Sequence, residues 1–270
     1  MNVVRRQWLA GICAAGAGIV LVGCARQETK QKGKAGSGDE DEEASDTEPV
    51  KSAAAEVTAT EDLMREHGVL RRALLVYQES AVKLRASAGT FTREPLQKTA
   101  MLFRAFGEEY HERKLEEAHI FPAVQKAGLA AVYTGVLTAQ HQRGRELTDY
   151  ILAVTAAPKI ASGNVEPLAR VMESLVRMYQ HHAAMEDTIV FPAWKQTMNV
   201  EQMDVMSEKF EEIEHEQFGK DGYEDAVKQI SDIEASLGLA DLGLFTAPAP
   251  PLLPEAKEAP EKQQNGGKQP

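Results

Sequence analysis

The chain contains very little cysteine and has no surplus of basic residues. Its 270 residues include two cysteines, Cys13 and Cys24, so the body of the chain can form neither a disulfide framework nor a thiolate zinc site. It carries 30 basic and 41 acidic side chains, a formal net charge of −11. Because binding to a phosphate backbone needs a basic face, this charge argues against nucleic acid as a partner. The apolar fraction of 43% still suffices for a hydrophobic core.

The apolar run near the start of the chain is too short for a membrane-spanning helix. It covers residues 8–22, whereas a span needs roughly 20 apolar residues. Arg5 and Arg6 precede the run and a glycine follows it, an arrangement typical of a secretory signal peptide. We therefore interpret residues 1–24 as a signal peptide, with an uncleaved apolar anchor as the alternative.

The end of this segment, Leu-Val-Gly-Cys24, resembles a bacterial lipobox. In lipoproteins of that kind the chain is cut before the cysteine, whose thiol is then acylated. The resemblance implies a lipid anchor at Cys24 and a location on the periplasmic side of the bacterial cell envelope, at the inner or the outer membrane. The stretch Arg5-Arg6-Gln-Trp-Leu also resembles a twin-arginine signal, so the export route stays open.

Two further segments lack the apolar residues that a fold needs. Residues 25–58 are rich in glycine, alanine, serine and charge, with seven acidic side chains between positions 39 and 48. Residues 246–270 are rich in proline, lysine, glutamine and glycine. Such compositions bury too little apolar surface to offset the entropy of ordering the chain. We expect the first segment to be a disordered acidic tether and the second to be a disordered tail.

Between these segments the apolar residues recur every three or four positions, which indicates helices. Thr60 is a candidate N-cap for the first helix. Short connections favour antiparallel neighbours, so residues 59–199 predict an all-α, up-down four-helix bundle made of two helical hairpins. Residues 200–245 predict additional C-terminal helices. The four long helical segments of the bundle are residues 61–87, 94–127, 130–156 and 166–198.

The two hairpins repeat one another. The second segment contains His-x4-Glu-x4-Phe-Pro-Ala starting at His111, and the fourth contains the same motif starting at His181. The first and third segments each contain Leu-x3-His, which ends at His67 in one and at His141 in the other. Each hairpin therefore has one histidine on its first helix and a His/Glu pair on its second.

Some of these polar residues lie in stripes that should face the core. In the first segment His67 falls within the apolar stripe, and in the fourth segment His182 and Glu186 do so, about one helical turn apart. A bundle core does not bury an unpaired carboxylate without strong compensation. Imidazole and carboxylate groups that face inward at one level are good ligands for a divalent or trivalent metal. The pattern therefore predicts a metal site inside the bundle.

The second segment leaves a choice of ligands open. His111 and Glu116 are five positions apart, which on a regular helix separates them by about 140°. A single π-turn would realign them, and such turns tend to lie at functional sites. Glu112 would align with Glu116 without one, although the repeat favours His111. In the fourth segment the stripe favours His182 over His181, and the residue that matches His182 is Glu112, so the two choices differ in register.

The histidine and glutamate pattern resembles the hemerythrin-like, His-His-Glu cation-binding family over roughly residues 58–194. The stretches Glu-Glu-Ala-His-Ile-Phe-Pro122 and Glu-Asp-Thr-Ile-Val-Phe-Pro192 carry the same resemblance. It implies a four-helix bundle with a non-haem di-iron centre that two carboxylates and an oxygen bridge. This chain has His-x4-Glu on its second helix where the family commonly has His-x3-Glu. The implied ligands are His67, His111, Glu116, His141, His182 and Glu186.

The resemblance also sets expectations about function. The implied ligand set leaves about two coordination positions open for O2, peroxide or water, and its donors suit iron or, as second choice, manganese. We expect a protein that binds or senses O2, or a related small oxidant, outside the cytoplasm. The alternatives are a di-iron peroxidase or oxidase, an enzyme that removes NO or O2, and an iron-storing or metal-free scaffold for a protein partner. Whether the chain is an enzyme stays open, and no catalytic residue is assigned.

Four further side chains have simpler interpretations. Tyr110 and Tyr179 fit core packing better than a role at the metal. His119 is expected beside the ligands or on the surface, and His215 on a solvated face.

Overall fold

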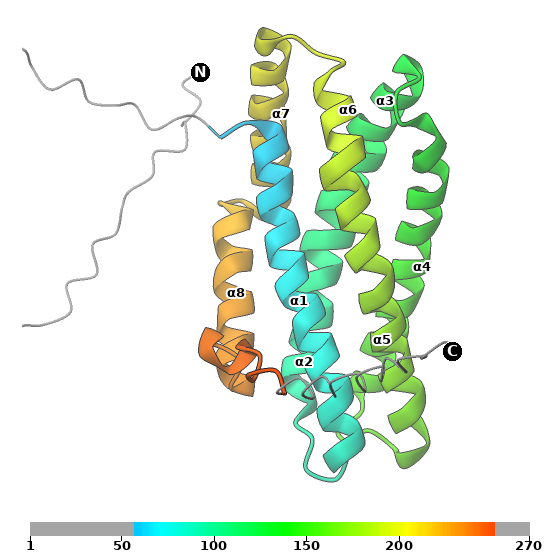
Figure 1. Cartoon of the computed structure of the whole chain (residues 1–270), viewed down its shortest axis with the longest axis vertical. Coiled ribbons are helices and arrows are strands. Elements are labelled where there is room, and N and C mark those ends of the chain that lie inside the picture. The colour runs from blue at the N-terminus through cyan, green and yellow to red at the C-terminus, as the bar shows by residue number, and fades with distance from the viewer. Residues whose placement is uncertain (1–56, 252–270) are drawn as a thin grey trace, which may run out of the picture. The chain divides into compact units, whose positions relative to one another are not determined.

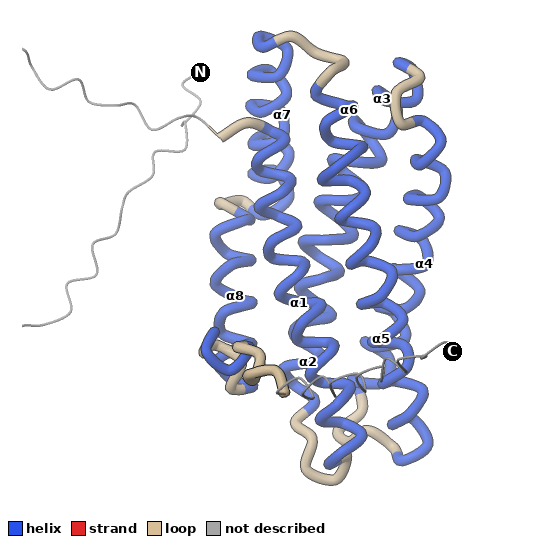
Figure 2. The backbone as a smooth tube through the Cα atoms, viewed as in Figure 1, coloured by secondary structure: helices blue, strands red, loops and turns tan. Residues whose placement is uncertain are grey.

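The computed structural model describes residues 57–251, and this part of the chain consists of helices and loops without a strand (Figure 2). The all-α prediction is therefore confirmed. The expected signal peptide with Cys24, nearly all of the tether and residues 252–270 of the tail lie outside the described residues. Within residues 57–251, no helix combines the length and the apolar character needed to cross a membrane.

Thr58 fixes the start of the first helix, α1 (Ala59–Ser87). Its side chain accepts a hydrogen bond from the backbone of Glu61, and the Glu61 side chain accepts one from the backbone of Thr58. This reciprocal pair is a capping box. The prediction that Thr60 is the N-cap is therefore wrong, because the Thr-x-x-Glu spacing selects Thr58 and leaves Thr60 buried inside the first turn.

The other three helices of the bundle follow with short connections. The second is one continuous helical rod in three parts, the third is regular, and the fourth is again a rod in three parts. Their bounds are α2 (Arg93–Leu102), the π-helical η1 (Phe103–Ile120) and α3 (Phe121–Ala127); α4 (Ala131–Ala156); and α5 (Ser162–Met185), the π-helical η2 (Glu186–Val190) and α6 (Phe191–Lys195).

Both π-helical segments end at the Phe-Pro step of the repeat. The Phe121 N–H donates to the carbonyl of Glu116, and the Phe191 N–H donates to that of Glu186, each five positions back. The next residue in each case is a proline, which has no N–H to donate. The sequence suggested a single π-turn near His111. The π-helical segment is much longer than one turn, because η1 runs for 18 residues. The second π-helical segment was not predicted.

The four helices surround one core. α1 packs against α5, α5 against α4, and α4 against α2 and η1, which in turn contact α1 (Figure 1). Large side chains with almost no exposed surface fill the interior along the length of the bundle. They include Tyr77, Phe103, Phe106, Tyr110 and Phe191.

The C-terminal helices cover one side of this bundle. They are α7 (Val200–Phe218) and α8 (Gly222–Leu237), followed by the short 3-10 helix η3 (Leu242–Phe245). Both α7 and α8 pack on α1, α7 also contacts η1, and α8 also contacts α2 (Figure 1). Arg72 of α1 holds α8 through a two-pronged ion pair with Glu234.

Candidate metal centre

Six buried side chains from all four helices of the bundle converge on one point. The four histidines each come from a different helical rod, and the two glutamates come from the π-helical segments. All six have at most 2% of their surface exposed. They are His67 of α1, His111 and Glu116 of η1, His141 of α4, His182 of α5 and Glu186 of η2.

The histidines meet in two pairs through their inner ring nitrogens. The Nε2 atoms of His67 and His111 are 3.0 Å apart, and those of His141 and His182 are also 3.0 Å apart. Two Nε2 atoms at this distance need something positive between them, either a proton or a metal cation. The first pair lies within the first hairpin and the second pair within the second hairpin.

The two carboxylates lie between these histidine pairs. Glu116 places Oε1 3.3 Å from Nε2 of His111 and Oε2 3.3 Å from Nε2 of His141. Glu186 places Oε2 3.0 Å from Nε2 of His182 and 3.5 Å from Nε2 of His67. Each carboxylate therefore reaches one histidine of each pair. None of their four oxygens has a hydrogen-bond donor in the described part of the chain.

The outer nitrogen of every histidine contacts an acceptor. Each Nδ1 lies 2.6–2.9 Å from a side-chain oxygen, so Nδ1 carries the proton and Nε2 is left for the centre of the cluster. Histidines that bind metals in proteins are oriented in this way. The pairs are His67 with Asp187, His111 with Glu66, His141 with Glu117, and His182 with Gln140.

Protonation of the cluster follows from burial and mutual contact. Burial lowers the pKa of His182 to about 3, and the neighbouring His141 adds to the effect. Burial also lowers the pKa of His141, but Glu112, Glu116 and Glu117 outweigh it and raise that pKa to about 10. The same contrast separates His67, whose pKa is lowered by burial, from His111, whose pKa the carboxylates raise despite its burial. Without a metal, each pair thus holds one proton between its Nε2 atoms.

These residues fit a metal centre. Glu116 belongs to two groups of ligand atoms that each lie within 4.8 Å of one another, one with His67 and His111 and the other with His141, His182 and Glu186. Imidazole with carboxylate is a donor set for iron, manganese or zinc. A cation in each group would replace the shared proton and give the unpartnered carboxylate oxygens a partner.

The four candidate ligands that the sequence left open lie in different surroundings. It brings His111 and His182 into the cluster, while His181 is exposed and Glu112 lies outside it. The register conflict disappears because the two helices change register at different points. η1 is π-helical throughout the step from His111 to Glu116, whereas η2 begins only at Glu186, so that His182 lies one α-helical turn before it.

Glu112 belongs to a polar network beside the cluster. It accepts a hydrogen bond from the Tyr179 hydroxyl at 2.6 Å and pairs with the Arg145 guanidinium at 3.3 Å. Arg145 also contacts Glu117 at 2.5 Å. The acidic grouping of Glu112 and Glu117 with His141 therefore holds an arginine, which makes it an ion-pair network and not a second metal site.

The sequence analysis missed the acceptors that orient the histidines. Glu66 and Gln140 each directly precede a histidine of the cluster, while Glu117 and Asp187 each directly follow a glutamate of the cluster. The acceptors therefore occupy equivalent positions in the two hairpins, as the ligands themselves do, so the repeat held the signal.

The remaining histidines lie away from the cluster. His119 is half-buried and its ring is tilted against Phe210 of α7, whereas His215 is exposed on α7. The step along the chain from His141 to His215 is as long as the step from His67 to His141. No His-x4-Glu pair follows His215 in α8, so α7 and α8 lack the other ligands.

A small cavity adjoins the cluster between α1, η1 and α5. Its volume of about 10 Å³ is close to the space that the centre of one water molecule needs. Leu70, Leu74 and Ala183 form apolar parts of its wall, and Tyr179 and Glu112 form polar parts. His67, His111, His182 and the carboxylates of Glu116 and Glu186 also line it.

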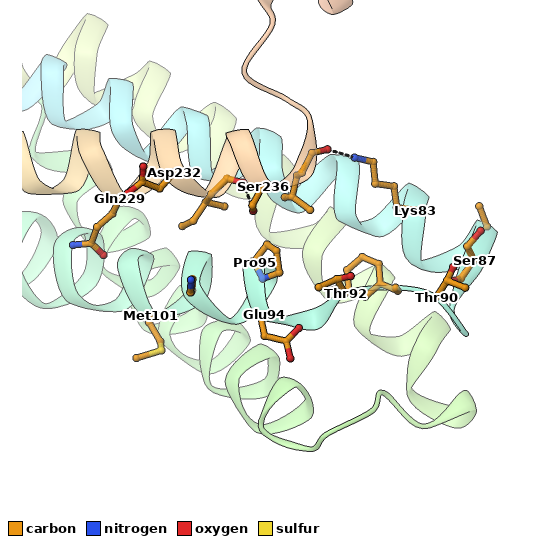
Figure 3. Close-up of a pocket in the computed structure, with 15 residues that line it drawn as sticks. Lys83, Ser87, Thr90, Thr92, Glu94, Pro95, Met101, Gln229, Asp232 and Ser236 are labelled. Carbon is orange, nitrogen blue, oxygen red and sulfur yellow. Dashed lines mark hydrogen bonds between the residues drawn. The ribbon is translucent and has the colours of Figure 1, made fainter.

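A larger hollow lies elsewhere, between α8, the end of α1 and the start of α2 (Figure 3). It is an open groove of about 870 Å³ whose wall includes Lys83, Pro95, Met101 and Asp232. It contains no histidine and no cluster of ligand atoms, and the Lys83 ammonium donates to the carbonyl of Leu237 at the end of α8. The clustered histidines and glutamates therefore adjoin the small inner cavity and not this groove.

Comparison with known proteins decides the family. The model of the hemerythrin HHE cation binding domain matches residues 58–194, and it matches again at residues 132–242. This chain belongs to the hemerythrin HHE cation-binding family. The first match spans the whole bundle with its six converging side chains, so cation binding is the shared property of the family and of this site. The second match spans α4, α5, α7 and α8, and thus includes His215 of α7.

Relatives in mycobacteria share most of the chain. The uncharacterized protein Mb2018 of Mycobacterium bovis and the uncharacterized protein Rv1995 of Mycobacterium tuberculosis are each 40% identical over 244 residues. The alignment covers 90% of this chain and 91% of each relative. No solved structure matches the chain.

Proposed function

We propose that this protein is a non-haem di-iron protein that binds or senses O2, or a related small oxidant, outside the cytoplasm. The observation that carries the proposal is the pair of histidine pairs with two carboxylates between them. Because each carboxylate reaches a histidine of both pairs, the arrangement supports two adjacent cations and not one. Imidazole and carboxylate donors without thiolate favour iron, with manganese as second choice.

The surrounding residues define what such a centre can accept. Two bound irons would supply a redox-active centre at which a small oxidant can bind. Leu70, Leu74 and Ala183 form the apolar part of the wall of a cavity of about 10 Å³, so only a very small molecule fits without rearrangement of its wall. The acceptors at each Nδ1 hold the imidazoles in place, so that the centre keeps its shape when a ligand enters.

Metal analysis tests the proposal directly. As-purified protein should contain close to two irons per chain and show near-ultraviolet absorption that differs between air and nitrogen. Glu186→Ala should lose both the iron and the absorption, whereas replacement of the exposed His181 by alanine should keep them. A sample that contains neither iron nor manganese would refute the proposal.

A di-iron enzyme is the second candidate, and the polar side of the cavity favours it. The cavity wall includes the Tyr179 hydroxyl and Glu112, which are side chains of the kind that transfer protons in enzymes. Steady turnover of peroxide or NO by iron-loaded protein, lost in Glu186→Ala, would support an enzyme. Iron-loaded protein that turns over neither compound would count against it.

The proposed location rests on the sequence before the described residues. A lipid anchor at Cys24 would place the bundle on the periplasmic side of the inner or outer membrane. Cells fed a labelled fatty acid should incorporate the label into the wild-type protein but not into Cys24→Ser, and the variant should leave the membrane fraction. Label in both proteins would argue against this anchor.

A further inference from the structure

Tyr179 and Glu112 form a polar pair at the edge of the inner cavity. The Tyr179 side chain is buried, and its hydroxyl donates to Oε1 of Glu112 at 2.6 Å. The other oxygen of Glu112 pairs with Arg145 at 3.3 Å, and the guanidinium is itself largely buried. Both Tyr179 and Glu112 line the cavity together with three of the clustered histidines.

The charge on Arg145 frees the tyrosine hydroxyl for a second partner. Because Glu112 is paired with a guanidinium, its charge stays compensated when the Tyr179 O–H rotates away. The hydroxyl can then donate to a ligand in the cavity, and it offers an oxygen lone pair while it still donates to Glu112. A small anion, or a diatomic molecule with an accepting atom, fits this wall better than an apolar gas.

Gly144 of α4 leaves the space that the Tyr179 hydroxyl occupies. A Cβ atom at position 144 would lie 1.9 Å from the Tyr179 hydroxyl oxygen and 2.7 Å from the ring carbon that carries it. Glycine disfavours a helix interior, yet Gly144 lies buried within α4. The close approach of Tyr179 accounts for the absence of a side chain there.

Tyr110, a second buried tyrosine near the cluster, provides a comparison with Tyr179. Tyr110 also donates to a buried carboxylate, Glu66, at 3.0 Å, and Glu66 orients His111. Tyr110 does not line the cavity. Removal of either hydroxyl deletes one buried hydrogen bond to a carboxylate, but only Tyr179 has access to a ligand.

We propose that the Tyr179–Glu112 pair hydrogen-bonds to the small ligand that enters the cavity, and that Gly144 is the residue that admits the Tyr179 hydroxyl to this position. The proposal rests on the proposed function, because it assigns the ligand-contacting residues of the same metal centre. It makes Tyr179 a specificity-determining residue that discriminates ligands with an accepting atom from those without one.

Azide binding tests the proposal without any measurement of turnover. The full chain is loaded with iron or, in parallel, with cobalt(II), and azide is titrated while the visible spectrum is recorded. Tyr179→Phe should weaken azide binding about tenfold or more, since a hydrogen bond to a charged ligand is lost. The matched control Tyr110→Phe should bind azide within about threefold of wild type. Equal affinity of Tyr179→Phe and wild type would overturn the proposal.

Gly144→Ala supplies a second perturbation that leaves the tyrosine in the sequence. The added methyl group displaces the hydroxyl, so azide binding should weaken as in Tyr179→Phe, and the double variant should lose no further affinity. Gly135→Ala is the control on the same helix, because a Cβ there meets nothing within 4 Å. Wild-type azide affinity in Gly144→Ala would overturn the role of Gly144.

The two metals separate this proposal from the proposed function. If as-purified protein holds no iron but the cobalt protein shows the azide effect, the iron assignment fails and the role of Tyr179 stands. If iron is present and Tyr179→Phe binds azide as the wild type does, the iron assignment stands and the proposed role of Tyr179 fails. Failure of the wild type to take up either metal would overturn both.

Discussion

Replacement of Glu186 by leucine should stabilise the metal-free protein while it destroys the metal centre. Glu186 is completely buried, and neither of its oxygens has a hydrogen-bond donor in the described part of the chain. Burial and the nearby Glu116 raise the pKa of its carboxyl well above the ordinary value. In the absence of metal neither oxygen of this carboxyl group accepts a hydrogen bond, and its nearest polar neighbour is Nε2 of His182 at 3.0 Å.

The expected gain follows from this lack of partners. An unsatisfied buried polar group costs about 1–3 kcal/mol, and leucine occupies similar space without any hydrogen-bonding need. Imperfect packing of the new side chain takes back up to about 1.5 kcal/mol. Glu186→Leu should thus raise the free energy of unfolding of the metal-free protein by about 1 kcal/mol, since the two effects together span roughly −0.5 to 3 kcal/mol.

Metal should reverse the order of stability. A ligand present at about 1,000 times its Kd stabilises the folded state by about 4 kcal/mol. Wild-type protein gains this contribution and Glu186→Leu does not, since it has lost a carboxylate that reaches both histidine pairs. With excess metal the wild type should therefore be the more stable by about 3 kcal/mol.

Urea unfolding, followed by circular dichroism with a chelator or with excess metal, measures both differences. Glu208→Leu, at an exposed position of α7, is the control and should shift the free energy of unfolding by less than about 0.5 kcal/mol in either condition. If Glu186→Leu instead destabilises the chelated protein by about 2 kcal/mol or more, as a core cavity would, then Glu186 is satisfied without metal. The reasoning from its unpartnered oxygens would then be wrong.

Three further predictions concern the same layer of the bundle. Glu117→Ala removes the acceptor at Nδ1 of His141 and should weaken metal binding about 10–100-fold in a chelator competition, with iron stoichiometry unchanged at saturation. Carboxylates raise the pKa of His111 and, to about 10, that of His141, so metal must displace protons; calorimetry in buffers of different ionisation enthalpy should show their release, and affinity should fall as the pH falls. Burial raises the pKa of Glu108 to about 7 from 4.5, so its contribution to stability is complete below pH 4.5 and is lost as the pH rises through 7. Glu108→Gln should therefore gain about 3 kcal/mol relative to wild type between pH 4.5 and pH 8, and an unchanged difference would contradict this.

The sequence predicted the helices and the six side chains that converge inside the bundle because both follow from periodicity. The apolar stripe placed His67 and His182 inward, and the repeat matched the first hairpin with the second position by position. These signals are local or nearly so. They depend on the spacing of side chains along a helix and need no knowledge of how one helix packs on another.

The register of the second helix depends on tertiary packing, which is why it was not predictable in full. A five-position step from His111 to Glu116 indicates some local change of register but not its extent. The structure spreads the change over all of η1, where buried aromatic side chains and ligands must both face the core. The same limit applies to Tyr179, whose role at the cavity depends on Gly144 of a different helix.

Each hairpin builds half of the centre and completes the other half. The first hairpin supplies the pair of His67 and His111, and it lends Glu117 to the Nδ1 of His141 in the second hairpin. The second hairpin in turn supplies Asp187, which contacts Nδ1 of His67 in the first hairpin and orients its ring. Neither hairpin alone can therefore orient its own first histidine, so the metal centre reports on correct docking of the two halves. A metal that binds this centre stabilises the contact between the hairpins, and folding and metal loading are coupled through it.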